Sequence, residues 1–257
     1  MFEASTRPSG WELVVEVNLR AVEEGVRPHV AQFDNLATHA QYRKAYAVVP
    51  AHLDATTRVL DWGCGNGHFC YFLDHLGLAP VGYSFEPPPR CMAGKAGFQH
   101  VPAADPTQLP FPDRSFDAVF SIGVLEHVHE TGGDEHASLL EIKRILVPGG
   151  LFFCFHLPNH LGWIEPAARL ARLPGHVHGR KYGRGDINTL VADAGMELVD
   201  AGRYNFLPRN RLARLPSALK QSRAVVRSLN MLDDGLALLL PMLCQNWYFV
   251  AREKRTN

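Results

Sequence analysis

Short hydrophobic runs alternate with amphipathic stretches along most of the chain. Residues 150–157 (GLFFCFHL) are almost all apolar, which is typical of a strand buried on both faces. The predicted strands lie at residues 58–62, 80–85, 98–101, 115–122, 150–157, 196–206 and 244–253. The predicted helices between them lie at residues 67–77, 136–146 and 185–195. This alternation predicts an α/β fold with a doubly wound, mostly parallel sheet.

The chain before the first predicted strand has a helical pattern. Ser9 and Glu12 fit a capping box, which predicts a helix at about residues 11–24. A second helix is expected at about residues 35–48, ahead of Pro50. The two helices would form a cap that precedes the sheet.

The stretch at residues 209–240 lies between the last two predicted strands and mixes basic with apolar side chains. Its basic residues are Arg209, Arg211, Arg214, Lys220, Arg223 and Arg227. A lid over the substrate side, a contact with an anionic surface such as a membrane, and a solvated helix packed on the sheet are all open interpretations. We predict one domain that divides into an N-terminal helical cap (1–55), a core (56–208), a helical insertion or lid (209–241), and the last strand with a tail (242–257).

The composition is that of an ordinary soluble protein. The 257 residues are 46% hydrophobic and carry a formal net charge of zero, which disfavours a broad nucleic-acid-binding surface. The five cysteines are scattered without a Cys-x-x-Cys pair, which indicates free thiols in a reducing compartment. Because the first residues also lack the pattern of a secretory signal, we expect a cytoplasmic protein.

The segment at residues 58–69 (RVLDWGCGNGHF) reads as a strand, a glycine-rich turn and the start of a helix. In an open parallel sheet, ligands bind where the strands end, and glycines let the backbone approach them closely. A dinucleotide fingerprint, G-x-G-x-x-G, would need glycine where this chain has His68. Asp61 lies two residues ahead of Gly63, and its carboxylate suits a cationic ammonium group better than a pyrophosphate.

Three segments resemble motifs of the class I S-adenosylmethionine-dependent methyltransferases, in the small-molecule branch often called type 11. They are VLDWGCGNGHF (59–69), ADPTQLPFPDRSFDAVFSIGVLEHV (104–128) and EIKRILVPGGLFFCF (141–155). The resemblance covers about residues 58–155, and the later strands occur in fitting places. It implies a Rossmann-like, seven-stranded sheet with the last strand antiparallel, and S-adenosylmethionine as the cofactor.

The resemblance also assigns roles in the glycine-rich turn. Asp61 would face the methionine amino group, directly or through water. Gly63, Gly65 and Gly67 would let the loop pass under the methionine and ribose. From the residues alone, the glycines could instead serve only the tight turn itself.

Two further segments receive roles in the same way. Asp105 would accept a hydrogen bond from the adenine amino group, with Pro106 beside the ring. Ser121 and Ile122, which end the fourth strand, would offer backbone carbonyls near the methionine end. An aspartate before proline also starts turns, so that interpretation of Asp105 stays open.

The acid expected to bind the ribose is displaced. Family members usually carry it at the end of the second strand, where this chain has Ser84, and the carboxylate is Glu86. Side chains alternate along a strand, so positions 84 and 86 would point to the same face. We predict that Glu86 binds the ribose hydroxyls; otherwise Ser84 or water would take this role.

The activated methyl group mainly needs a nucleophile placed in line with it, and a hydroxyl acceptor also needs a base. His127 follows the fourth strand directly and His156 ends the fifth, so these two are the predicted catalytic residues. A structural role for each histidine is the alternative. His176, His178 and Tyr182 are expected to line the acceptor pocket.

A metal site has also to be considered. Plausible ligands near the end of the fourth strand are Glu126, His127, His129, Glu130 and His136. The region resembles quinone-biosynthesis O-methyltransferases, some of which use an acid before the Glu-His pair to hold a divalent ion. This chain has Gly123 three residues before Glu126, so the set is incomplete and we predict no metal.

The expected function is O-methylation of a small-molecule hydroxyl, on a natural product, a sugar or a lipid-linked intermediate. The segment SIGVLEH (121–127) does not match the (D/N)PPY motif of amino-methylating enzymes. No nucleic-acid partner is expected, whereas the basic insertion allows contact with a membrane surface. N- or C-methylation, a dinucleotide-dependent oxidoreductase, and a non-catalytic cofactor-binding module are the alternatives, and the sequence leaves the oligomeric state open.

Overall fold

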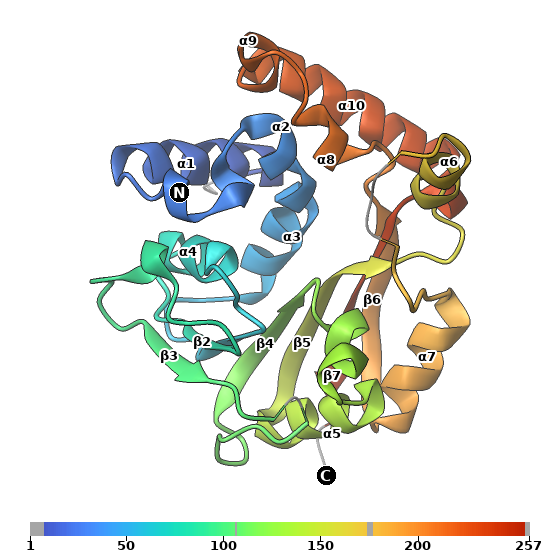
Figure 1. The fold of residues 1–257 in the computed structure, drawn as a ribbon. Helices are drawn as coiled ribbons and strands as arrows, with labels where there is room; N and C mark the ends of the chain where they lie inside the picture. Colours follow the sequence, from blue (N-terminus) through green and yellow to red (C-terminus); the bar gives the residue numbers. More distant parts are fainter. Residues whose placement is uncertain (1–7, 106, 174–176, 255–257) are drawn as a thin grey trace, which may run out of the picture.

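The computed structural model describes residues 8–105, 107–173 and 177–254. Seven strands in this part of the chain form one sheet with the order β3-β2-β1-β4-β5-β7-β6. The strands are β1 (Val59–Trp62), β2 (Val81–Ser84), β3 (Gln99–Pro102), β4 (Phe116–Ile122), β5 (Leu146–Pro158), β6 (Met196–Tyr204) and β7 (Asn246–Glu253). The first five strands pair in parallel, and β7 runs antiparallel between β5 and β6. The predicted Rossmann-like sheet with an antiparallel last strand is therefore confirmed (Figure 1).

Helices cover both faces of the sheet. The main connecting helices are α4 (His68–His75), α5 (Glu135–Ile145) and α7 (Arg184–Asp193), close to their predicted positions. One hydrophobic core joins α1 (Gly10–Glu23), α3 (Arg43–Val48) and α4 to the sheet through residues such as Tyr46, Phe72 and Phe120. A second core joins α5 and α7 to the opposite face through residues such as Ile142 and Val191. Continuous apolar strands such as 152–155 supply both cores, as expected for a sheet buried on both sides.

Strand β5 begins earlier than its apolar run suggests. The predicted strand begins at Gly150, at the end of the sequence VPGG (147–150), but the observed strand already pairs at Leu146, opposite Phe116 on β4. The register then shifts before Ala118 and Leu151 pair. Gly149 has a φ of +84°, which allows the backbone to bulge at this point without strain.

The N-terminal helices are only partly as predicted. Helix α1 (Gly10–Glu23) has the expected capping box between Ser9 and Glu12. The expected second helix is broken into α2 (Leu36–His39) and α3 (Arg43–Val48), with a 3-10 turn between them. The break lets Tyr42 point inward, where its ring lies 4.3 Å from the ring of His68 and 4.8 Å from that of His156.

The insertion between β6 and β7 is helical, as predicted. It contains α8 (Arg209–Leu212), α9 (Ser217–Lys220) and α10 (Arg223–Leu239). Asp233 on α10 is fully buried, and its Oδ2 atom lies 2.9 Å from Arg209 and 2.7 Å from Arg43 on α3. This ion pair joins the insertion to the N-terminal helices, and the two groups lie together at the top of Figure 1. We call this assembly of α1–α3 and α8–α10 the roof.

The remaining elements are short. They are α6 (Ile164–Leu170) and the 3-10 helices η1 (Arg27–His29), η2 (Ala31–Phe33), η3 (Ala40–Tyr42), η4 (Val49–His52), η5 (Arg90–Met92), η6 (Leu125–Thr131) and η7 (Pro241–Leu243). Of the helices in the described ranges, each is too short or too polar to cross a membrane.

Candidate cofactor and acceptor site

The glycine-rich turn between β1 and α4 needs its glycines for two different reasons. Gly63 and Gly67 have φ values of +79° and +80°, and a Cβ atom there would lie 2.5 Å from Val124 and 2.6 Å from Pro89. Gly65 has a φ of +49°, but an added Cβ would meet nothing nearer than a backbone oxygen at 3.9 Å. The turn is therefore packed against the protein at its ends and open at its middle, as a ligand cradle requires.

Asp61 lies on β1 directly under this turn. Its side chain is buried, and the Cys70 thiol donates to Oδ2 at 3.1 Å. Burial raises the pKa of Asp61 to about 7, although the Cys70 hydrogen bond opposes the shift. A cation bound beside the carboxylate would favour its ionised form, so this position fits the ammonium group of an amino acid.

The end of β2 differs from the expectation. Strand β2 stops at Ser84, so the alternation that would align positions 84 and 86 does not continue to Glu86. The Ser84 hydroxyl is buried and lies 3.4 Å from His100 Nε2 and 3.5 Å from the Glu86 carbonyl oxygen. Glu86 is exposed. Of the two side chains, only the Glu86 carboxylate is accessible to a ligand from solvent.

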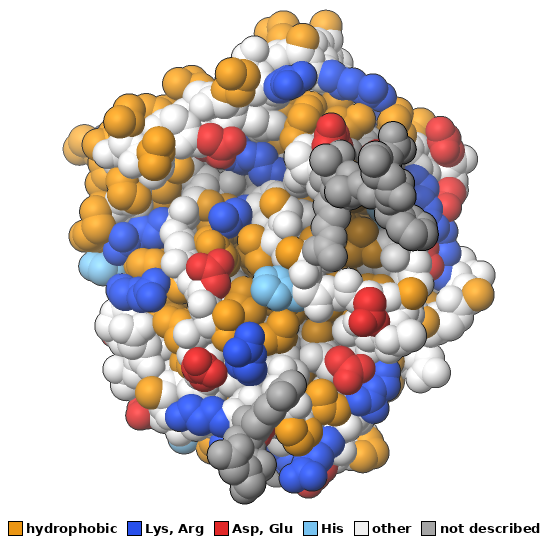
Figure 2. Space-filling model, turned by 180° about the vertical axis from the view of Figure 1, so that it is seen from behind, with side chains coloured by type: hydrophobic (Ala, Val, Ile, Leu, Met, Phe, Trp, Pro, Cys, Tyr) orange, Lys and Arg blue, Asp and Glu red, His pale blue; other side chains and the backbone are white. Residues whose placement is uncertain are grey.

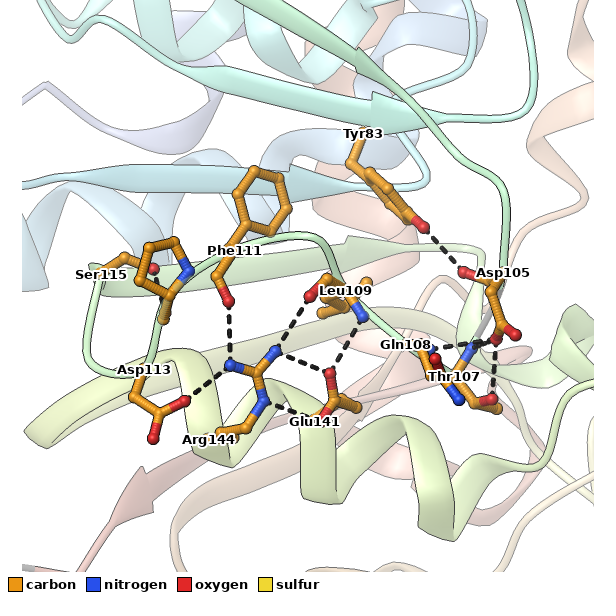
Figure 3. Close-up of polar contacts among 11 residues, drawn as sticks. Tyr83, Asp105, Thr107, Gln108, Leu109, Phe111, Asp113, Ser115, Glu141 and Arg144 are labelled. Atoms are coloured by element: carbon orange, nitrogen blue, oxygen red, sulfur yellow. Dashed lines mark hydrogen bonds and ion pairs between the residues drawn. The ribbon is translucent and has the colours of Figure 1, made fainter.

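Asp105 starts a turn, as its position before proline allowed (Figure 3). Its Oδ1 atom accepts hydrogen bonds from the Thr107 amide and hydroxyl and from the Gln108 amide. These bonds hold the pKa of the carboxyl below its usual range. The predicted partner Pro106 lies outside the described residues. All three of these hydrogen bonds go to one carboxylate oxygen, Oδ1.

The segment after Asp105 is fixed by one arginine, as Figure 3 shows. Arg144 on α5 donates to the carbonyls of Leu109 and Phe111 and pairs with Asp113 and Glu141. This clamp holds the connection between β3 and β4 in place. No local sequence signal predicts this clamp, because the arginine lies more than thirty residues further along the chain.

A cavity of about 830 Å³ opens where β4 and β5 end. Its lining includes Tyr42, Ile122, His127, His156 and Arg214. The N-terminal helices, the sheet edge, α6 and the insertion thus all contribute to one pocket. A second cavity of about 470 Å³ lies at the opposite sheet edge, around Asp117 and Gly149, where ligands of such folds do not bind.

The predicted residues at the end of β4 reach this pocket to different degrees. Ile122 and Gly123 line it. Ser121 is fully buried and its hydroxyl accepts from the Leu125 amide at 3.3 Å. The pocket therefore meets the sheet at the backbone of residues 122 and 123.

Both predicted catalytic histidines line the pocket, but their surroundings differ. Nδ1 of His127 lies 2.8 Å from Glu130 Oε1, and the side chain is one-third exposed. His156 is only partly exposed; desolvation of its ring lowers its pKa to about 4, and its Nδ1 lies 3.2 Å from Asn246 Nδ2. His156 is therefore neutral near pH 7 and is held as a structural histidine would be.

The sequence did not give Glu126 a catalytic role, yet it is the buried acid of this pocket. Burial raises its pKa to about 8. Among the described residues, none hydrogen-bonds its Oε2 atom. His178 lines the same pocket as predicted, whereas Tyr182 is turned away and donates to Glu135. His176 lies outside the described residues.

Comparison with known proteins agrees with this geometry. Residues 60–154 match a family model described as a methyltransferase domain. A methyltransferase from Burkholderia thailandensis, solved with 1,6-didemethyltoxoflavin and S-adenosylhomocysteine, shares the fold with a TM-score of 0.56 at 19% identity, over 99% of this chain and 93% of its own. Residues 60–154 thus resemble a methyltransferase domain, and the whole chain has the fold of class I methyltransferases. The cofactor of this family, S-adenosylmethionine, fits the open turn at Gly65 and the buried acid beneath it.

Curated relatives of this methyltransferase domain act on different substrates. An uncharacterized methyltransferase from Mycobacterium sp. (strain JLS) is 34% identical over 49% of this chain and 54% of its own. A sterol 24-C-methyltransferase from Aspergillus fumigatus is 30% identical over 63% and 43%. A tRNA (carboxymethyluridine(34)-5-O)-methyltransferase from Arabidopsis thaliana is 30% identical over 50% and 30%. The chain spans about half the length of the relatives it matches, or less.

Proposed function

We propose that this chain is an active S-adenosylmethionine-dependent methyltransferase that methylates a hydroxyl of a small molecule. The supporting observation is the pocket at Ile122 and Gly123, which joins the cofactor edge of the sheet to His127 and His156. A volume of about 830 Å³ suits a small molecule or one end of a lipid-linked intermediate. The formal net charge of zero gives no support to a nucleic-acid acceptor.

In this proposal three side chains, one turn and the backbone of one further residue hold the cofactor. Asp61 binds the ammonium group, and the open turn at Gly65 passes under the methionine and ribose. Glu86 binds the ribose hydroxyls from the solvent side, and Asp105 accepts from the adenine amino group through Oδ2. Ile122 offers its backbone near the methionine end. The bound cofactor supplies a methyl group that its sulfonium has already activated.

We propose His127, rather than His156, as the side chain that meets the acceptor. His127 is oriented by Glu130 and is partly open to the pocket, so an incoming hydroxyl can reach its ring. His156 is partly buried between Tyr42 and Tyr204 and forms a contact with Asn246. Its role here is to shape the pocket wall.

The outer part of the pocket favours an acceptor with a negative charge. Arg169, Arg172 and Arg214 line it, and the exposed side of α10 begins with Arg223 and Arg227.

The surface next to these basic residues is apolar. Further along, α10 and η7 expose Met231, Leu232, Leu238, Leu239 and Met242. Figure 2 shows hydrophobic side chains gathered at one upper corner of the molecule and basic ones along its upper edge. Such a surface supports an acceptor that is presented at an anionic membrane.

The test is a transfer assay with methyl-labelled S-adenosylmethionine, purified protein and an extract of the source cells. Products are separated into small polar, lipid-extractable and macromolecular fractions. Base-stable label in a small or lipid fraction, with an O-methyl group identified by mass spectrometry, supports the proposal. A C- or N-methyl product would show that the acceptor atom is not oxygen. Label found only in macromolecules would contradict a small acceptor. Tight cofactor binding without any transfer would identify a non-catalytic module.

A further inference from the structure

Three side chains of the pocket lie close enough together to share one ion. Glu126 and His127 come from η6, and His178 comes from the segment between α6 and α7. One potential ligand atom from each lies within 4.8 Å of the other two, and His127 Nε2 is 3.9 Å from Glu126 Oε1. Ligand atoms bound at zinc distances lie about 3.3 Å apart in a tetrahedron. The three groups would therefore have to move together by only about 1.5 Å.

Both histidines are oriented in the way that metal-binding histidines usually are. Nδ1 of His127 contacts Glu130, and Nδ1 of His178 contacts Glu165. A carboxylate on one ring nitrogen fixes the ring and makes the other nitrogen a better ligand. In both residues the carboxylate is on Nδ1, so Nε2 is the nitrogen presented to an ion.

The buried acid gives an independent reason to expect a cation. Glu126 is 3% exposed, and in the described part of the chain its Oε2 atom has no hydrogen-bond partner. A buried carboxylate oxygen without a partner costs free energy, because it has lost its water and gained nothing in exchange. A bound cation would replace that water.

We propose that Glu126, His127 and His178 bind one divalent transition metal, zinc foremost, in the wall of the acceptor pocket. Two imidazole nitrogens and one carboxylate oxygen form the His2Glu set of catalytic zinc sites, and the same set suits iron(II). Three protein ligands leave at least one position open, and all three residues line the pocket.

The metal's role rests on the proposed function, whereas its binding does not. A hydroxyl that occupies the open position loses its proton more readily, which is what methylation of an oxygen needs. His127 would then meet the acceptor through the metal. The sequence predicted no metal because the residues next to Glu126 form an incomplete set; His178, which completes it, lies 52 residues further along the chain.

Metal binding can be measured without any knowledge of the acceptor. Untagged protein is purified without chelators, analysed for bound metals, stripped and titrated with cobalt(II), whose visible absorption reports nitrogen and oxygen ligation. H178Q and E126Q remove one ligand each. H136Q is the matched control, because His136 lies in the same stretch of sequence but is exposed on α5, outside the cluster. Binding of S-adenosylhomocysteine shows that each variant is folded.

We expect one metal per chain, and at least about 100-fold weaker cobalt binding in H178Q, more than the 10–100-fold typical of losing a supporting residue. H136Q should bind as the wild type does. No stoichiometric metal, or equal binding by the wild type and H178Q, would overturn the site. Methyl transfer that persists in metal-free protein would overturn only the metal's role, and metal binding without transfer would count against the proposed function alone.

Discussion

Asp61 is a deeply buried acid, and its burial makes the stability of the folded protein depend on pH. The folded protein keeps this proton up to a pH of about 7, whereas the unfolded chain releases it near pH 4. The stability that comes from burying the neutral acid is therefore present below about pH 4 and is lost as the pH rises toward 7. A bound ammonium group would reverse this preference and favour the ionised carboxylate.

We therefore expect cofactor binding to release a proton from Asp61. Titration calorimetry with S-adenosylhomocysteine at pH 6, in buffers of different ionisation enthalpy, should show close to one proton released per chain by the wild type. D61N should release none from this site and should bind more weakly. Equal proton release by both proteins would mean that Asp61 does not face the amino group.

Local signals explain which site residues the sequence could identify. Asp61 and the three glycines lie next to each other in the sequence, and the roles proposed for them rest on the resemblance of this one strand and turn. Asp105 followed a local rule too, because an aspartate before proline starts a turn. The proximity of Glu126 and His178 has no local signal, since it depends on where the connection after β5 crosses the pocket.

At the level of elements, the two glycines that flank α4 allow the stability cost of backbone strain to be measured apart from the cost of a steric clash. Gly67 and Gly77 flank α4 with φ values of +80° and +82°. A Cβ at Gly67 would lie 2.6 Å from Pro89, whereas a Cβ at Gly77 would meet nothing within 4 Å. We expect G77A to cost about 1–2 kcal/mol of stability from strain alone.

G67A adds a collision to the same strain, which should cost a further 1–3 kcal/mol, roughly. It should also weaken S-adenosylhomocysteine binding at least about tenfold, whereas G77A should leave the affinity unchanged. Denaturant unfolding and calorimetry measure the two effects. Equal affinities in both variants would show that the packing of this turn does not shape the cofactor site.

The elements were predicted best where one pattern runs without interruption. The strands and α4, α5 and α7 follow their apolar periodicity closely. The expected helix at residues 35–48 is broken because tertiary contacts outweigh the local helical pattern. The ring of Tyr42 turns inward and packs against two histidines. Strand β5 starts early because Gly149 allows a bulge, which the VPGG motif alone does not distinguish from a turn.

At the level of the whole molecule, one buried carboxylate joins the two parts of the roof. Asp233 is fully buried; burial alone would raise its pKa, but Arg209 and Arg43 hold it below its usual range. Its neighbour Asp234 also contacts Arg43 but is two-thirds exposed. We expect D233A to lower the free energy of unfolding by about 3–5 kcal/mol, because it leaves Arg209 buried without its partner.

D234A is the matched control, and it should cost less than about 1 kcal/mol. Both variants are measured by denaturant unfolding near pH 7. Should the two cost the same, the roof would be held by its apolar contacts and not by the ion pair. Loss of this ion pair should also let the insertion open more often, so D233A is expected to raise the rate of proteolysis within the insertion.

The bond between Arg43 and Asp233 spans 190 positions of sequence. At a synthesis rate of 5–20 residues per second, Arg43 is made about 10–40 s before its partner. Strand β7, which the sheet needs between β5 and β6, is made later still. During translation, the nascent chain thus contains the cofactor turn long before the acceptor pocket can be complete, because the lining of that pocket extends to Asn246.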